Sequence, residues 1–188
     1  MIITQAQRSE AALIARLIML AMNHECCQNL AGPDRSLDDF HRLMTQLVEL
    51  EESQYSYRNT LVARSDEGAL MGICVGYRGD RLHTLRRAFI DGARRELQRD
   101  HSHMADETQA GEYYIDSLAV LPDYRHRGVA SALLRAMIVR AEDEGLPAAL
   151  LVDQGNPQAE RLYTSLGFRV TGDATWGGHP MRHMLHFS

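Results

Sequence analysis

The sequence predicts an α/β fold with one mixed, mostly antiparallel sheet flanked by helices. Short apolar or β-branched runs alternate with helical patterns along the chain, which is typical of this class. In the second half, an apolar run at residues 112–121 precedes a helix, and a buried run at residues 148–153 follows that helix. A strand, a helix and a strand in that order form a right-handed β-α-β unit with parallel strands. We therefore expect about six or seven strands, about four helices and one insertion.

Length and composition indicate one domain. The 188 residues, of which 45% are hydrophobic and 24% charged, can bury one core, so residues 1–188 are predicted to form a single domain. No apolar run approaches the roughly 20 residues that span a bilayer, and the first residues lack the basic region of a secretory signal. A net charge of -5 without a long basic tract argues against nucleic acid. We expect a cytoplasmic protein with neither membrane nor nucleic-acid partners.

The front of the chain reads as one strand and two helices. Residues 2–6 form a short apolar run, and a helix is predicted from Ser9 with Leu13, Leu17 and Leu20 on one stripe. Gly32-Pro33 marks a break. Ser36 then opens a second helix, whose apolar positions recur at helical spacing: Leu37, Phe40, Leu43, Met44 and Leu47.

The middle of the chain contains a hairpin and then the insertion. Residues 60–64 and 69–77 are apolar runs separated by Asp66-Glu67-Gly68, a pattern that predicts two antiparallel strands. Residues 78–111 read as a helical insertion, with a helix at 84–99 and a polar stretch after it. Five arginines are expected to form its basic face, either solvated or as a lid over a ligand: Arg86, Arg87, Arg94, Arg95 and Arg99.

The end of the chain has well-marked boundaries. A helix at 128–144 is closed by Gly145, and Asn156-Pro157 caps a short helix that stops at Gly167. Residues 168–171 and 181–187 are predicted to form a closing antiparallel hairpin with a wide loop around Gly177-Gly178.

Residues 113–131 carry the strongest functional signal. An apolar strand runs through a short turn into a helix start at which Gly128 and Ala130 keep side chains away from the backbone. The first N–H groups of a helix lack partners and attract anions, and Arg125 and Arg127 add positive charge. The segment therefore predicts a pyrophosphate site. Neither G-x-x-x-x-G-K-[ST] nor G-x-G-x-x-G occurs, so a nucleotide triphosphatase or a dinucleotide fold has no motif here.

The order Arg125-x-x-Gly128-x-Ala130 resembles the Q/R-x-x-G-x-G/A motif of the GNAT superfamily of N-acetyltransferases, with alanine where glycine is common. A second matching piece, residues 156–168, follows after one β-α-β unit, and the resemblance is specific over residues 112–168. It implies a GNAT-like fold with a β-α-β coenzyme A binding unit. It also implies acetyl-coenzyme A as co-substrate and direct acetyl transfer to a primary amine, with no metal.

The resemblance assigns residues to the coenzyme. The backbone of the turn and helix start would hold the pyrophosphate, at Arg125, His126, Arg127, Gly128, Val129 and Ala130. The strand that contains Leu118, Ala119 and Val120 would diverge from the next parallel strand and pair its main chain with pantetheine. Asn156 would donate a hydrogen bond to the coenzyme, although an N-cap role alone would also explain it.

The resemblance also implies the catalytic residues. Tyr163 would give a proton to the departing thiolate, the alternative being a packed aromatic residue. Asp116 is the candidate base for the amine, directly or through water, with Glu112 as second choice and Tyr114 shaping the pocket. Asp116 could instead only bond to backbone groups.

Several alternatives stay open. A non-catalytic acyl-coenzyme A binding or sensing module could use the same cleft, and the acyl group could be longer than acetyl. The acceptor could be a small-molecule or peptide amine, which Asp106, Glu107 and Glu112 could attract. A homodimer is common in the family. His101-Ser102-His103 lacks a third ligand at a supported position, which argues against a metal site.

Overall fold

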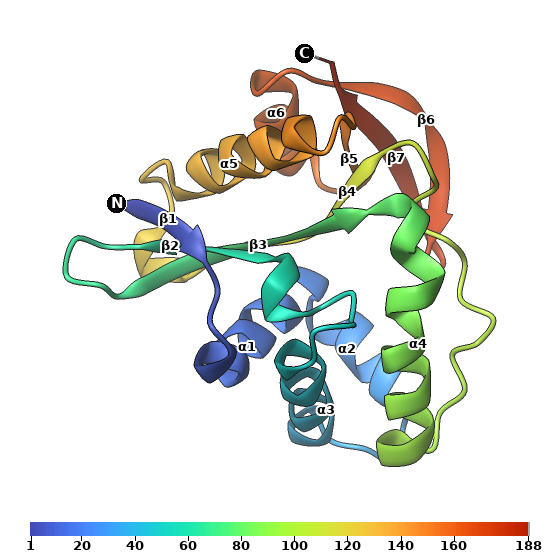
Figure 1. Cartoon of the computed structure of the whole chain (residues 1–188). Helices are drawn as coiled ribbons and strands as arrows, with labels where there is room; N and C mark the ends of the chain where they lie inside the picture. The colour runs from blue at the N-terminus through green and yellow to red at the C-terminus, as the bar shows by residue number, and fades with distance from the viewer. Residues whose placement is uncertain (188) are drawn as a thin grey trace.

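The computed structural model describes residues 1–187 and contains one seven-stranded sheet between two layers of helices (Figure 1). The strands lie in the order β1-β2-β3-β4-β5-β7-β6. Only β4 and β5 pair in parallel within the described part of the chain. The predicted mixed, mostly antiparallel α/β fold is confirmed.

The bounds of the elements are as follows. The strands are β1 (Ile2–Gln5), β2 (Thr60–Arg64), β3 (Leu70–Arg78), β4 (Tyr113–Val120), β5 (Ala148–Asp153), β6 (Phe168–Trp176) and β7 (His179–His186). The α-helices are α1 (Ala11–Met22), α2 (His24–Ala31), α3 (Leu37–Glu49), α4 (Leu82–Gly92), α5 (Val129–Asp143) and α6 (Pro157–Ser165).

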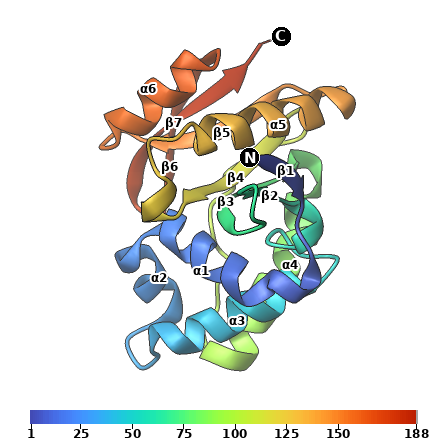
Figure 2. The same ribbon diagram turned by 90° about the vertical axis from the view of Figure 1, so that its left-hand side faces the viewer.

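Alternation along the central strands supplies both faces of the sheet. Ile73 and Val75 of β3 face the layer of α1 and α3, whereas Cys74 faces α5. Figures 1 and 2 show α1 to α4 on one side of the sheet and α5 with α6 on the other. Each face therefore has its own apolar core, and the central strands are covered on both sides.

The front helices differ from the prediction. The stretch predicted as one helix is divided at Asn23, whose left-handed φ of 69° ends α1 and whose side chain accepts the N–H of Cys26 to start α2. Of the predicted stripe only Leu17 is buried, while Leu13 and Leu20 are 39% and 44% exposed. Ile14 and Ile18 fill the core instead. The second helix and its capping Ser36 are confirmed.

The insertion is helical, but the predicted basic face is wrong at one position. The helix starts earlier than predicted, at Leu82, and ends in a π-helical turn, Ala93–Leu97. The sequence places Arg86 in a solvated or lid-forming face, yet this residue is 4% exposed. A spacing pattern alone cannot reveal that two acidic residues of the following loop, Asp106 and Glu107, turn back to neutralise it.

The closing hairpin is longer and tighter than predicted. Both of its strands extend to a two-residue turn, Gly177-Gly178, instead of ending at a wide loop. Both glycines have left-handed φ, 59° and 83°, as a type I′ hairpin turn requires. The extension brings Trp176 and His179 to the lining of a cavity beside β4.

Within residues 1–187, no helix combines the length and the apolar character needed to cross a membrane.

Candidate active site

The two parallel strands separate where the site lies. β4 and β5 pair at only three positions, Tyr113 with Ala148, Tyr114 with Ala149 and Ile115 with Leu150. From Asp116 onward, β4 continues without β5 as a partner. The main chain on this side of β4 can therefore receive an added, strand-like ligand. This is the divergence that the family resemblance implies.

A cavity of about 690 Å³ lies along this opening. One wall of it comes from β4, and a β-bulge in the pairing with β3 leaves Asp116 of this wall without a partner residue on β3. The lining residues of β4 are Tyr114, Asp116, Ser117, Leu118 and Val120. The opposite wall contains Asn156 and Tyr163 from the start and the middle of α6. Further parts come from α1, α2, the loop before β4 and the β6-β7 turn. The cavity is thus large enough for a ligand that extends from the wall formed by α6 to the parts formed by α1, α2 and the loop before β4.

The N-terminus of α5 is prepared for an anion. Gly128 has a left-handed φ of 78°, and no side chain caps the first N–H groups of this helix. His126 is also left-handed, with φ of 59°, and left-handed residues are part of the backbone turns that form anion-binding concavities. A Cβ at Gly128 would meet nothing within 4 Å. The residues present therefore fit a pyrophosphate held mainly by main-chain groups.

The side chains of the turn contribute less than its backbone. The Arg125 Nε donates to the Val120 carbonyl oxygen at 3.3 Å, and the Arg127 guanidinium lies 5.7 Å from the ring centre of Tyr124. Both arginines are exposed. Of the six predicted pyrophosphate residues, only Ala130 lines the cavity, and Val129 is buried in the core.

The other predicted coenzyme residues divide in the same way. Leu118, Val120 and Asn156 line the cavity, whereas the Ala119 side chain is buried in the opposite core. Ala119 can therefore offer only main-chain atoms to a ligand. Asn156 is the N-cap of α6, accepting the Ala159 N–H at 3.1 Å through its Oδ1. Its side-chain N–H groups remain able to donate.

Tyr163 is a half-buried wall residue of the cavity. Its ring meets Phe168 edge to face, with the ring centres 6.0 Å apart. Burial raises the pKa of the Tyr163 phenol to about 12, so the hydroxyl stays protonated at neutral pH. It is therefore placed to donate a hydrogen bond or a proton.

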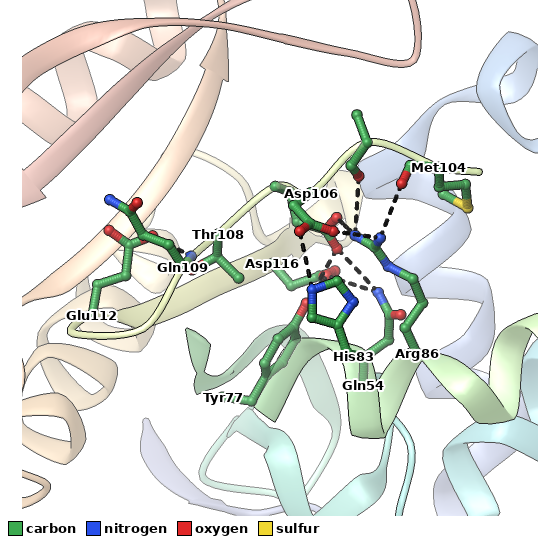
Figure 3. Close-up of polar contacts among 12 residues, drawn as sticks. Gln54, Tyr77, His83, Arg86, Met104, Asp106, Thr108, Gln109, Glu112 and Asp116 are labelled. Atoms are coloured by element: carbon green, nitrogen blue, oxygen red, sulfur yellow. Dashed lines mark hydrogen bonds and ion pairs between the residues drawn. The ribbon is translucent and has the colours of Figure 1, made fainter. Parts of the chain in front are cut away.

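Asp116, drawn with Tyr77 and Gln54 in Figure 3, forms a carboxyl pair with Glu107 at the cavity. Tyr77 lies across from β4 and donates its hydroxyl to both, at 3.3 Å from Glu107 Oε1 and 3.2 Å from Asp116 Oδ2. The Gln54 amide also reaches both, at 3.4 and 3.5 Å. Ser117 donates to Asp116 Oδ1 at 2.7 Å. The three side chains that donate to these carboxyl groups are thus all buried.

The environment raises the proton affinity of both carboxyl groups. Burial, together with the charge of Asp116, raises the pKa of Glu107 from 4.5 to about 7, while Arg86 opposes the shift. Burial also raises the pKa of Asp116, against the hydrogen bonds from Ser117, Tyr77 and Gln54. A carboxyl group with a pKa near neutrality, such as that of Glu107, can accept a proton from an amine.

Arg86 fixes the loop that carries Glu107. Its guanidinium pairs with Glu107, lies 3.0 Å from Asp106 Oδ1, and donates to the carbonyl oxygens of Met104 and Ala105 at 3.3 and 3.1 Å (Figure 3). Four contacts from one buried side chain hold residues 104–107 against α4. Sequence reasoning places Glu107 near the substrate but does not identify Arg86, Tyr77 or Gln54, because no local pattern connects them.

Glu112, the second candidate for the base, is not among the residues that line the cavity. Its Oε1 accepts the Thr108 hydroxyl at 2.6 Å, and its Oε2 lies 3.0 Å from His183 Nε2. Burial alone would raise the pKa of Glu112, but these hydrogen bonds lower it overall. Glu112 therefore joins the loop to β7 as an ionised structural residue.

His101 and His183 lie apart from the cavity, whereas His179 is part of its lining. His101 lies on Phe89 and near the Leu30 carbonyl, and His183 is engaged by Glu112. Among residues 1–187, no group of three histidine, cysteine or acidic side chains could hold a metal ion.

A strand opening, an uncapped helix start and a carboxyl pair thus lie around one cavity. The model of the acetyltransferase (GNAT) family matches residues 19–168, and the chain belongs to this family. The resemblance seen in the sequence is thereby confirmed.

Relatives with curated sequences match over part of their length. An uncharacterized N-acetyltransferase of Mycobacterium tuberculosis is 37% identical over 68 residues, which is 35% of this chain and 44% of the relative. Human N-acetyltransferase 8 is 36% identical over 75 residues, 37% of this chain and 33% of the relative. The chain thus matches less than half the length of either protein.

Solved structures match over the whole chain. The crystal structure of an acetyltransferase superposes with a TM-score of 0.84 at 25% identity, covering 99% of this chain and 98% of the other. An N-acetyltransferase from Staphylococcus aureus Mu50 gives 0.80 at 19% identity, covering 98% and 100%. The latter likeness concerns the fold.

Proposed function

We propose that the protein transfers an acetyl group from acetyl-coenzyme A directly to a primary amine. The observation that carries this proposal is the opening between β4 and β5, which leads along a cavity with Asn156 and Tyr163 on one wall and Asp116 on the other. Acetyl-coenzyme A supplies the acetyl group as a thioester, and the chain supplies binding and proton transfer.

Main-chain groups would do most of the binding. The main chain at Leu118 and Val120, which β5 does not pair, would bond to the pantetheine amides, and the backbone from Arg125 to Ala130 would receive the pyrophosphate. Asn156, already the N-cap of α6, would add one side-chain donor. We propose no metal in this arrangement.

Two groups of the chain would move protons. When the acceptor nitrogen bonds to the acetyl carbon, the carbon–sulfur bond breaks and the nitrogen loses a proton to the pair of Asp116 and Glu107. Tyr163 would donate to the departing sulfur. A phenol titrates near pKa ~10 and a thiol near ~8.5, and burial of Tyr163 widens that gap. Tyr163 would therefore stabilise the thiolate by hydrogen bonding or transfer its proton only in part.

A cysteine intermediate is not needed. Cys26 lines the cavity, but burial raises its pKa to about 11, so its thiol remains protonated at neutral pH. Cys74 is fully buried between β3 and α5, and burial raises its pKa as well. Direct transfer requires neither thiol.

The test is coenzyme A thiol release from acetyl-coenzyme A over a panel of primary amines, run beside calorimetric binding of acetyl-coenzyme A. The chain has no lysine, since all 20 of its lysine-plus-arginine residues are arginines, so acetylation of its own side-chain amines adds no background. Asp116→Asn and Tyr163→Phe should bind the coenzyme but release thiol slowly. Tyr57→Phe, outside the cavity, is the matched control.

Each outcome separates the alternatives. Tight binding without release for any amine would favour a non-catalytic acyl-coenzyme A sensor. Unchanged release in both variants would refute the proposed mechanism, and faster release from longer acyl donors would extend the acyl preference. We further propose a cytoplasmic location and a small-molecule or peptide acceptor, with a homodimer as the assembly to test by light scattering.

A further inference from the structure

The acceptor end of the cavity is lined by segments remote from the coenzyme-binding turn. Met22 lies at the end of α1, Leu30 in α2, Tyr55 after α3, and Met104 in the loop before β4. Trp176 adds an aromatic ring from the β6-β7 hairpin. These side chains are apolar or aromatic, and methionine adapts its shape to different neighbours. The surface suits an apolar body.

The acidic side chains at the cavity outnumber the basic ones. Glu107, Asp116 and Asp153 line it, and the one basic side chain in the lining is His179, whose Nδ1 lies 3.9 Å from Asp153 Oδ2. None of the chain's 20 arginines lines the cavity within residues 1–187, and the chain has no lysine. Arg86 lies behind the wall in space, but its contacts are with Asp106, Glu107 and two carbonyl oxygens.

The start of α2 does not replace a missing cation. Asn23 lines the cavity, but its Oδ1 already accepts the Cys26 N–H at 2.9 Å. Glu25 places a further negative charge in this first turn. A carboxylate bound here would lose its hydration and face like charges, which costs several kcal/mol.

We infer that the acceptor is a primary amine with an apolar body and no carboxylate, such as an arylalkylamine. Its ammonium group would approach the pair of Asp116 and Glu107, and its body would lie against Met22, Tyr55 and Met104. Amino acids with a free carboxylate would be excluded by charge and not by size. This inference rests on the proposed function and names the substrate class of the same site.

The experiment compares amines that differ only in the carboxylate. Phenethylamine, phenylalanine and phenylalaninamide are each tested with the acetyl-coenzyme A complex for thiol release, and with the coenzyme A complex for calorimetric binding. Phenethylamine should exceed phenylalanine in kcat/KM by at least about 100-fold, which corresponds to about 2.8 kcal/mol. Phenylalaninamide should lie near phenethylamine, because it keeps the added size without the negative charge.

Substitution of Met22 tests whether the charge at the cavity wall causes the preference. Met22→Arg places a guanidinium at the cavity wall and should reduce the preference for phenethylamine over phenylalanine by about tenfold or more. Met22→Gln, neutral and of similar length, should keep the preference. Equal wild-type rates with phenylalanine and phenethylamine would overturn the inference while supporting acetyl transfer. Selective binding of phenethylamine without thiol release from any amine would support the inference and refute the proposed function.

Discussion

Glu107 and Asp116 share the hydroxyl of Tyr77, which lies 3.3 Å from one carboxyl group and 3.2 Å from the other. One hydroxyl has one proton, so it can donate fully to only one of them at a time. Two carboxyl groups that share one hydroxyl, one of them buried and the other half-buried, resist simultaneous ionisation. The pair is therefore expected to hold one proton near neutral pH and to titrate as a unit.

The first prediction concerns the pH dependence of the rate. Because the pKa of Glu107 is raised to about 7, kcat/KM should rise with pH through an apparent pKa near that value. Glu107→Gln removes the like charge and should move this rise to lower pH. The amine substrate itself ionises with a pKa of ~10, so its effect on the pH profile can be separated from that of the carboxyl pair. A profile that stays flat across neutral pH would contradict the role of the pair.

The same shift affects stability. Glu107 binds its proton more tightly in the folded chain than in the unfolded one, so its contribution to the free energy of unfolding should fall as pH rises from 4.5 to about 7. Denaturation of wild type and Glu107→Gln across this range measures the difference. An increase of that contribution with pH would show the opposite sign and refute the shift.

The second prediction concerns Tyr163. Tyr163→Phe should lower kcat by about 10- to 100-fold, because general acid assistance is lost, while the affinity for acetyl-coenzyme A stays close to wild type. Stability should change little, because no hydrogen bond of the hydroxyl within the described chain supports the fold. Stopped-time thiol assays and calorimetry check both values. A kcat equal to wild type would make Tyr163 a packing residue only.

The third prediction separates backbone strain from ligand binding on one helix. Gly128 and Gly145 lie at opposite ends of α5, both left-handed with φ of 78° and 68°, and a Cβ at either meets nothing within 4 Å. Alanine at either position should cost a similar amount of stability, about 1–2 kcal/mol, which is the left-handed penalty. Only Gly128→Ala should also weaken coenzyme A binding, by about tenfold. Equal affinities in the two variants would place the pyrophosphate elsewhere.

The fourth prediction contrasts Glu112 with Asp116. Glu112→Gln disturbs the contacts of the carboxylate with Thr108 and His183 and should lower the free energy of unfolding by about 1–3 kcal/mol with little loss of turnover. Asp116→Asn should lower turnover by about 100-fold or more and keep stability, since burial already disfavours its charge. Chemical denaturation and thiol assays on both variants decide. The reverse pattern would make Glu112 the base.

Local patterns predict the coenzyme half of the site well. Asn156 caps α6 and Pro157 begins it, as the sequence indicates. Tyr163 follows seven positions after Asn156, within the same helix. Leu118 and Val120 alternate on one strand face and pack against the core beneath α5, which follows from the period of a strand. Such relations lie within single elements, so the sequence contains them directly.

The acceptor half depends on contacts between distant segments. Arg86 looks like one of several surface arginines until the path of the loop brings Asp106 and Glu107 back onto α4. Gln54 reaches Asp116 across 62 positions of the chain. The closing hairpin of β6 and β7 also lacks the alternation of apolar and polar residues that is typical of half-buried strands. The sequence therefore predicts strands that are too short. Tertiary packing decides these features, and no local propensity expresses it.

The two ends of the insertion are held together where the chain leaves β3 and where it enters β4. The Gly79 N–H donates to the Glu112 carbonyl oxygen at 2.8 Å, and a Cβ at Gly79 would come within 1.9 Å of the Gln109 oxygen. Between these fixed ends, one loop carries both Met104, a wall of the acceptor space, and Glu107, a member of the carboxyl pair. Exchange of this loop between homologous enzymes would therefore alter substrate choice and pH optimum together. Evolution along this segment would change the two traits as one.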